Sequence, residues 1–151
     1  MQFADCADTY IYTNFQRMTI LIAEDDADDR FLIQTAFEEK GFNDKLDFVE
    51  NGIELMLYLN TAAQKAAPHI ILLDLNMPKK DGREILCELK QHHLFKRIPI
   101  IVFTTTKNEK EIRHCYDLGA NTYIVKPTSF DGLLSIVEQI HFYWEHAAAI
   151  S

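Results

Sequence analysis

The segment Ile70-Ile71-Leu72-Leu73-Asp74-Leu75-Asn76-Met77-Pro78 decides the fold class of this chain. Its first four residues are all aliphatic and lack the alternation of a half-exposed strand, and so short a run is typical of a strand buried on both faces. The run ends at Asp74, a carboxylate placed directly after the strand. We therefore predict a central strand of a parallel sheet over residues 70–73, with Asp74 at its carboxyl end.

Four further strands and five helices are expected along the rest of the chain. The other strands are indicated by apolar runs at residues 19–23, 46–49, 98–103 and 122–125, of which 46–49 is the least apolar. Helical stretches alternate with them, and five β–α units joined by short loops imply a parallel sheet covered by helices on both faces. We expect the α/β class: a doubly wound, five-stranded, flavodoxin-like parallel sheet with strand order 2-1-3-4-5.

Apolar residues at helical spacing mark the sides on which the five helices are expected to pack. They are Phe31, Ile33, Ala36 and Phe37 in the first helix; Ile53, Leu55, Met56 and Leu59 in the second; Ile85, Leu86 and Leu89 in the third; Ile112, Tyr116 and Leu118 in the fourth; and Leu133, Val137, Ile140 and Trp144 in the last, from about Ser129 to Glu145. Gly41 is expected to end the first helix, because glycine readily adopts the left-handed conformation that follows a helix.

Composition narrows the class of protein and its partners. Fifteen Lys and Arg against twenty-three Asp and Glu give a net charge of −8, which disfavours nucleic-acid binding. No apolar run is long enough to cross a bilayer, no signal-peptide pattern opens the chain, and three cysteines without metal-ligand spacing suit reduced thiols. We expect a cytoplasmic protein without membrane or nucleic-acid contacts, with one domain at 18–146, a flexible extension at 1–17 and a tail at 147–151.

Carboxylates follow two strands that should be neighbours. Glu24-Asp25-Asp26 follows the first strand, and Asp74 follows the third. In the expected strand order, ligands bind beyond the carboxyl ends of strands one and three, where the order reverses. Asp25, Asp26 and Asp74 would then repel one another unless a cation neutralises them, and a few oxygen ligands beside solvent suit Mg²⁺. The alternative, that Asp25 or Asp26 caps the following helix, applies to one of them at most and leaves Asp74 unexplained.

Two more strand ends face the same edge of the sheet. Thr104 ends the fourth strand, and Lys126 follows the fifth. The fifth strand lies two strands from Asp74, about 10 Å away, a gap that a lysine side chain can largely bridge. A hydroxyl and an ammonium would therefore point at whatever Asp74 carries.

These motifs together resemble the receiver domain of two-component response regulators, over residues 18 to about 142. The matching pieces are Ile20-Leu21-Ile22-Ala23-Glu24-Asp25-Asp26, Leu72-Leu73-Asp74-Leu75-Asn76-Met77-Pro78 with Asp81-Gly82, Ile101-Val102-Phe103-Thr104, and Tyr123-Ile124-Val125-Lys126-Pro127. Finer features resemble the single-domain regulators that work with bacteriophytochromes. They are Thr104-Thr105-Thr106, residues 78–84 and Phe142-Tyr143-Trp144.

The resemblance implies a phosphorylation switch with a metal ion. Asp74 corresponds to the phosphoacceptor, and Asp25 and Asp26 correspond to Mg²⁺ ligands, together with Asp74 itself and the backbone carbonyl of Asn76. The side chains of Asn76 and Thr106 are expected to flank the water that hydrolyses the acyl phosphate. Such a protein catalyses only its own phosphorylation and dephosphorylation.

The resemblance also assigns the residues of the switch. Thr104 corresponds to the hydroxyl that bonds the phosphoryl group, Lys126 to its ion-pair partner and Tyr123 to the aromatic residue that reorients. The family implies a cis Lys126–Pro127 bond, which proline's low cis penalty allows.

The expected partners are a sensor histidine kinase or a phosphotransfer protein. We expect no effector domain after the last helix, and therefore output through partner proteins or through a homodimer. The dimer would use the fourth helix, fifth strand and fifth helix, or the aromatic C-terminal end. One alternative function is a haloacid-dehalogenase-like Mg²⁺-dependent phosphatase, although such enzymes carry a second Asp where this chain has Asn76. A scaffold that works without phosphorylation is the other.

Overall fold

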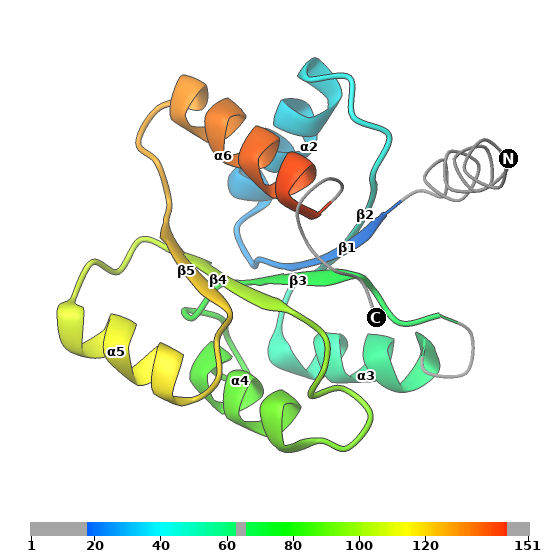
Figure 1. Cartoon of the computed structure of the whole chain (residues 1–151), viewed down its shortest axis with the longest axis vertical. Helices are drawn as coiled ribbons and strands as arrows, with labels where there is room; N and C mark the ends of the chain where they lie inside the picture. The colour runs from blue at the N-terminus through cyan, green and yellow to red at the C-terminus, as the bar shows by residue number, and fades with distance from the viewer. Residues whose placement is uncertain (1–17, 63–65, 145–151) are drawn as a thin grey trace, which may run out of the picture.

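The computed structural model describes residues 18–62 and 66–144 and shows alternating strands and helices (Figure 1). In chain order these are β1 (Thr19–Ala23), α2 (Ala27–Glu39), β2 (Lys45–Val49), α3 (Gly52–Ala62), β3 (Ile70–Leu73), α4 (Gly82–Gln91), β4 (Ile100–Thr104), α5 (Glu109–Asp117), β5 (Thr122–Val125) and α6 (Phe130–Phe142). The predicted extension, the tail and the predicted end of the last helix at Glu145 lie outside the described residues. None of the helices within the described part of the chain is long and apolar enough to span a membrane.

The five strands form one parallel sheet in the order β2-β1-β3-β4-β5, which confirms the predicted doubly wound topology. β1 and β3 are neighbours although a strand and two helices separate them in sequence, and Ala23 pairs with Leu73 at their carboxyl ends. The fourth strand begins at Ile100, two residues later than predicted. Pro99 has no N–H to donate to the sheet. Its carbonyl accepts a hydrogen bond from the Ile71 amide of β3 at 3.0 Å, just before β4 begins.

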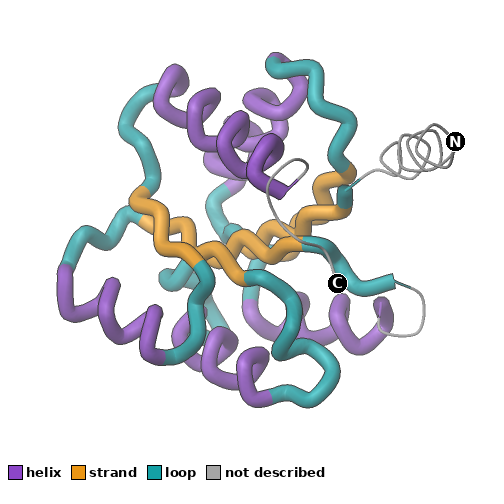
Figure 2. Tube along the Cα trace, in the orientation of Figure 1, coloured by secondary structure: helices purple, strands orange, loops and turns teal. Residues whose placement is uncertain are grey.

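Helices cover both faces of the sheet (Figure 2). On one face α2 and α6 pack over the core cluster of Ile20, Ile22, Ile33, Ala36, Phe37, Ile70, Leu72, Ile101, Phe103, Leu133, Val137 and Ile140. On the other face lie α3, α4 and α5, over a cluster that includes Leu21, Leu55, Leu59, Leu73, Ile85, Leu86, Leu89, Val102 and Cys115. Alternate residues of each strand therefore belong to opposite clusters, as the pleat requires.

Three residues predicted to pack inward are exposed instead. Phe31 is 70% exposed, Ile53 50% and Tyr116 46%. Phe31 and Ile53 each precede the first buried apolar side chain of their helix by two positions, about 200° around the helix axis, and therefore point away from the sheet. In α5 the buried position is Cys115, one residue before Tyr116, so the predicted stripe was displaced.

Two backbone expectations have opposite outcomes. Gly41 has the predicted left-handed conformation, with φ of 73°, directly after the C-cap residue of α2. The Lys126–Pro127 bond, expected to be cis, is trans, because no peptide bond in the described residues is cis.

Candidate phosphoacceptor and metal site

Asp74 and Glu24 are the first residues after two neighbouring strands. The Asp74 amide donates to the carbonyl of Ala23 at 3.1 Å, and the Glu24 amide donates to that of Val49 at 2.9 Å. Sheet hydrogen bonding therefore continues to the residues that carry the carboxylates, and sets their positions relative to one another. This is the edge between β1 and β3 where the sequence predicts a site.

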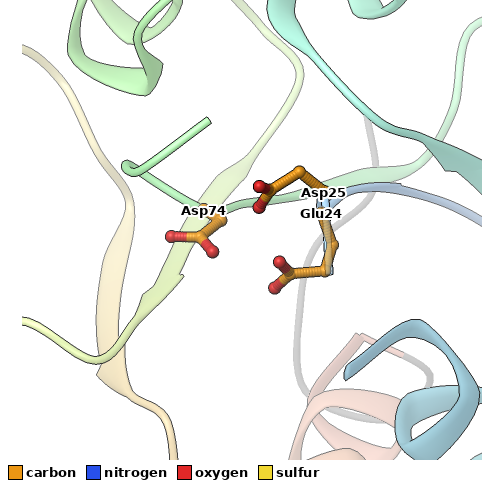
Figure 3. A group of neighbouring side chains, drawn as sticks. All are labelled: Glu24, Asp25 and Asp74. Carbon is orange, nitrogen blue, oxygen red and sulfur yellow. The ribbon is translucent and has the colours of Figure 1, made fainter. Parts of the chain in front are cut away.

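Three carboxylates gather at this edge. Oxygens of Glu24, Asp25 and Asp74 lie within 4.8 Å of one another, and Figure 3 shows the side chains extending from the ends of β1 and β3 into one shared space. Glu24 is only 2% exposed and Asp74 only 6%, whereas Asp25 lies at the exposed side. Two buried charges beside an open third one make a site that a small cation can reach from solvent.

Asp26, which the sequence predicts as a metal ligand, caps a helix in the structure. Its side chain is the N-cap of α2, and its Oδ1 accepts the amides of Asp28 at 2.8 Å and Asp29 at 3.0 Å. These are two of the amides that have no partner within the helix, so the carboxylate is held by the helix end. The carboxylate that lies with those of Asp25 and Asp74 is that of Glu24.

Lys126 reaches the same space from β5. Its amide donates to the Thr104 carbonyl at 2.8 Å, and its Nζ lies 3.0 Å from Asp74 Oδ2. The same ammonium lies 2.5 Å from Glu24 Oε1 and 2.8 Å from Asp29 Oδ2. The predicted reach across two strands is therefore present, and the lysine has three anionic partners.

Thr104 and Asn76 lie on the other side of Asp74. Thr104 is completely buried at the end of β4, and its Oγ1 accepts a long hydrogen bond of 3.5 Å from Asn76 Nδ2. The Asn76 amide donates to Asp74 Oδ1 at 3.1 Å. One Asp74 oxygen is thus held by the loop that follows it, and the other by Lys126.

The loop after Asp74 returns close to its own start. The Gly82 amide donates to the Leu75 carbonyl at 3.0 Å. A Cβ at Gly82 would lie 2.5 Å from the Asp74 carbonyl oxygen and 2.6 Å from Leu75 Cα, both backbone atoms, so only glycine fits there. This close approach places the N-terminus of α4 directly against the loop that follows Asp74.

Tyr123 is partly buried against the core cluster under α3, α4 and α5. Its hydroxyl donates to the Thr106 carbonyl at 2.7 Å, and its amide donates to the Tyr116 hydroxyl at 3.0 Å. Burial raises the pKa of Tyr123 to about 12, and neighbouring groups on α5 add to the effect. The phenol therefore joins β5 both to the loop after Thr104 and to α5.

The electrostatics of the site favour a divalent cation. Burial raises the pKa of Glu24, and nearby Asp74 raises it further, while a hydrogen bond from Lys126 opposes the shift. Burial opposes the charge of Lys126, but the hydrogen bonds that its ammonium donates to Asp29 and Glu24 raise its pKa overall. One ammonium cannot neutralise all of these carboxylates, and hard oxygen donors partly open to solvent fit a cation such as Mg²⁺.

Two residues at the site, Glu24 and Asp29, were not assigned roles by sequence reasoning. A signal for Glu24 was present: Asp is a preferred N-cap residue, and Asp28 and Asp29 supply the acidic first turn of a helix. Recognising Asp26 as the cap would have left Glu24 and Asp25 as the pair facing Asp74. Asp29 had no comparable signal, because its contact with Lys126 joins residues 97 positions apart in sequence.

Comparisons with known proteins agree with this geometry. Residues 20–138 match the response regulator receiver domain. The response regulator Rcp1 of Synechocystis is 37% identical over 128 residues, covering 83% of this chain and 87% of Rcp1. The crystal structure of the phosphorylated cyanobacterial phytochrome response regulator RcpA superposes with a TM-score of 0.81 at 40% identity, covering 88% of this chain and 97% of that one. The Mn²⁺-bound form of response regulator Rcp1 gives 0.79 at 34% identity, covering 89% and 99%.

The haloacid-dehalogenase-like alternative is not supported. These matches are to response regulators, and Asp74 follows the third strand of the chain. The family match spans most of the chain, and Rcp1 is 37% identical over 83% of it. The chain therefore belongs to the response regulator receiver domain family.

Proposed function

We propose that this receiver domain takes a phosphoryl group from a histidine kinase or phosphotransfer protein onto Asp74. The supporting observation is that the buried Asp74 carboxylate lies 3.0 Å from the Lys126 ammonium and beside Glu24 and Asp25. In the transfer, the P–N bond of the donor phosphohistidine breaks as a P–O bond to Asp74 forms, and the histidine nitrogen keeps the electron pair. Positioning and charge neutralisation account for most of the catalysis of such a transfer.

The first test is phosphorylation with a small donor. Acetyl phosphate and Mg²⁺ should add one phosphoryl group to the wild type, detected by intact-protein mass spectrometry as an acid-labile adduct. Asp74→Asn should abolish the adduct, since an amide oxygen is too poor a nucleophile to form it. Asp81→Asn is a matched control, because Asp81 caps α4 outside the acidic cluster and asparagine caps equally well. Undiminished labelling of Asp74→Asn would exclude Asp74 as the acceptor.

Mg²⁺ is the proposed ion, held by Glu24, Asp25 and Asp74 with the backbone carbonyl of Asn76. Bound there, it would lower the negative charge that an incoming phosphoryl group meets. The relative Rcp1 has been crystallised with Mn²⁺, an ion that also prefers oxygen ligands. The family thus supports a divalent cation here, and the choice of Mg²⁺ rests on the few hard ligands beside solvent.

The capping role of Asp26 allows a matched pair of variants at adjacent residues. Asp25→Asn should raise the Mg²⁺ concentration for half-maximal labelling at least about tenfold, because a direct ligand is lost. Asp26→Asn removes an equal charge but keeps the α2 cap, so its Mg²⁺ dependence should stay close to wild type. Equal losses in both variants would return Asp26 to the ligand set that the sequence predicts.

The switch is proposed to begin at Thr104. A phosphoryl oxygen on Asp74 accepts a hydrogen bond from the Thr104 hydroxyl, which now receives only the long bond from Asn76. Because Tyr123 bonds the carbonyl of Thr106, movement of this loop is transmitted to β5 and α5. Thr104→Ala should therefore be phosphorylated but should lose most of the beryllofluoride-induced NMR shift changes in α5. Unchanged shifts would exclude Thr104 from the switch.

Turnover is proposed to be limited to the protein's own acyl phosphate. Asn76 is exposed and Thr106 half-buried, so both can line the approach of water to Asp74. We expect hydrolysis of the aspartyl phosphate without turnover of phosphate esters such as p-nitrophenyl phosphate.

Output is proposed to pass through partner proteins in the cytoplasm or through a homodimer. Tyr116 on α5 is 46% exposed, and Phe142 and Tyr143 at the end of α6 are 44% and 57% exposed. Exposed aromatic side chains are common at protein interfaces. Light scattering at two concentrations, with and without beryllofluoride, distinguishes a dimer from a monomer that signals by recruiting other proteins.

A further inference from the structure

Lys126 contacts three carboxylates at once. Two of them, on Glu24 and Asp74, follow strands, whereas the third, on Asp29, lies on a helix. Its Nζ lies 2.5 Å from Glu24 Oε1, 2.8 Å from Asp29 Oδ2 and 3.0 Å from Asp74 Oδ2. An ammonium group has three N–H donors, so these contacts use all of them. Asp29 comes from α2, on the face of the sheet opposite to α4 and α5.

The start of α2 positions Asp29 firmly. Asp26 caps the helix, and the Asp29 amide itself donates to Asp26 Oδ1 at 3.0 Å. The Asp29 side chain is 37% exposed, compared with 2% for Glu24 and 8% for Asp74. Asp29 is therefore the partner of Lys126 that lies nearest to solvent, from which a phosphoryl donor must come.

A phosphoryl group on Asp74 needs an N–H group of Lys126 as a hydrogen-bond donor, and one of these N–H groups already bonds Asp29. During transfer from acetyl phosphate, the P–O bond to acetate breaks with its electron pair leaving on acetate, and a new P–O bond forms to an Asp74 oxygen. The Lys126 ammonium keeps its protons and can stabilise the transferring oxygens only by turning an N–H away from a present partner. The Asp29 charge also repels the anionic donor.

We propose that Asp29 is a positioning residue that competes with the phosphoryl group for Lys126, and that it thereby slows phosphorylation of Asp74 by small anionic donors. This inference rests on the proposed function of Asp74. Removing the Asp29 charge should consequently produce a faster reaction. A variant that only disturbed the packing of α2 would be slower.

The test compares Asp29→Asn with Asp28→Asn in the full chain. Asp28 is its neighbour on α2, is exposed, and is not among the contacts of Lys126. At saturating Mg²⁺, Asp29→Asn should be labelled by acetyl phosphate about fivefold faster than wild type, the effect of one charge acting through water at close range. Asp28→Asn should stay within about twofold of wild type, since exposed and more distant charges are screened.

Two further measurements show whether the effect passes through Lys126. The beryllofluoride concentration for half-maximal NMR shift change should fall by a similar factor in Asp29→Asn. In a Lys126→Ala background, the Asp29→Asn change should give no more acceleration than Asp28→Asn.

Each other outcome has a defined meaning. Slower labelling of Asp29→Asn, equal acceleration by both Asn variants, or acceleration that persists without Lys126 would overturn the competition. A wild type that acetyl phosphate does not label would overturn the proposed function instead, so the two failures are distinguishable.

Discussion

Helices α5 and α6 lie on opposite faces of the sheet, and they are anchored in different ways. α6 buries Leu133, Val137 and Ile140 against the sheet. Within α5, all of which the structure describes, Cys115 is the single buried side chain. Burying a leucine, valine or isoleucine contributes about 1.5–3 kcal/mol, so α6 is held mainly by apolar packing.

α5 depends instead on polar contacts near its ends. Arg83, which follows the cap of α4, pairs with Glu111 in the first turn of α5 and with Asp81. Tyr116 accepts the Tyr123 amide, and the loop before α5 accepts the Tyr123 hydroxyl. Such contacts can exchange for others at small cost. We therefore expect α5 to shift more easily than α6 when the loop after β4 changes.

The largest expected difference between α5 and α6 is in how much the loss of a buried side chain lowers the free energy of unfolding. Leu133→Ala in α6 should cost about 2–5 kcal/mol, because a buried leucine leaves a cavity. Cys115→Ala in α5 removes one sulfur atom and should cost only about 1 kcal/mol. Urea denaturation of both variants measures this, and comparable losses would contradict the contrast between the two helices.

The Tyr123 hydroxyl should have an intermediate effect. Tyr123→Phe removes the bond to the Thr106 carbonyl and should cost about 0.5–1.5 kcal/mol. Amides of α5 should then exchange with solvent faster, with little change in α6. Hydrogen exchange followed by NMR resolves the two helices. If α6 loosened as much as α5, Tyr123 would support the whole domain and would not be a local anchor.

The smallest effects should come from two ion pairs that join helices in the described part of the chain. Arg83→Gln breaks the contact between α4 and α5 and should cost about 0.5–1 kcal/mol, since both partners are partly exposed. Lys40→Gln breaks the more exposed contact with Glu138, between α2 and α6, and should cost less than about 0.5 kcal/mol. Faster exchange of α5 amides is expected only for Arg83→Gln. The reverse pattern would mean that the ion pairs do not distinguish the two layers.

Sequence patterns predicted the sheet well because buried parallel strands have a simple signature. Ile70–Leu73 is a fully buried aliphatic run whose limits the structure reproduces, and the limits of the less buried Thr122–Val125 are also reproduced. Helix sides were predicted less well. A helix can rotate by one or two residues with little change in its apolar periodicity, which is how Phe31 and Tyr116 were placed inward and are exposed.

At the site too, the positions of residues at strand ends were predicted better than those of residues beside a helix. Asp74, Thr104 and Lys126 are strand-end residues, and a correct sheet order is sufficient to bring them together. The carboxylates that lie near Asp74 are those of Glu24 and Asp25, whereas the predicted metal ligands are Asp25 and Asp26. A loop carboxylate can cap a helix or face a ligand with equal chemistry. Only the start of α2 decides between the two, by using Asp26 as its cap.

By itself, the sequence determined the α/β class and the strand order, and it placed Asp74 at the end of the central strand, because these follow from residue patterns along strands. Only the tertiary structure decided that Glu24 and not Asp26 lies beside Asp74, and that Asp29 shares Lys126 with it. These are contacts between segments far apart in sequence or between alternative side-chain directions, and packing of α2 against the sheet selects among them.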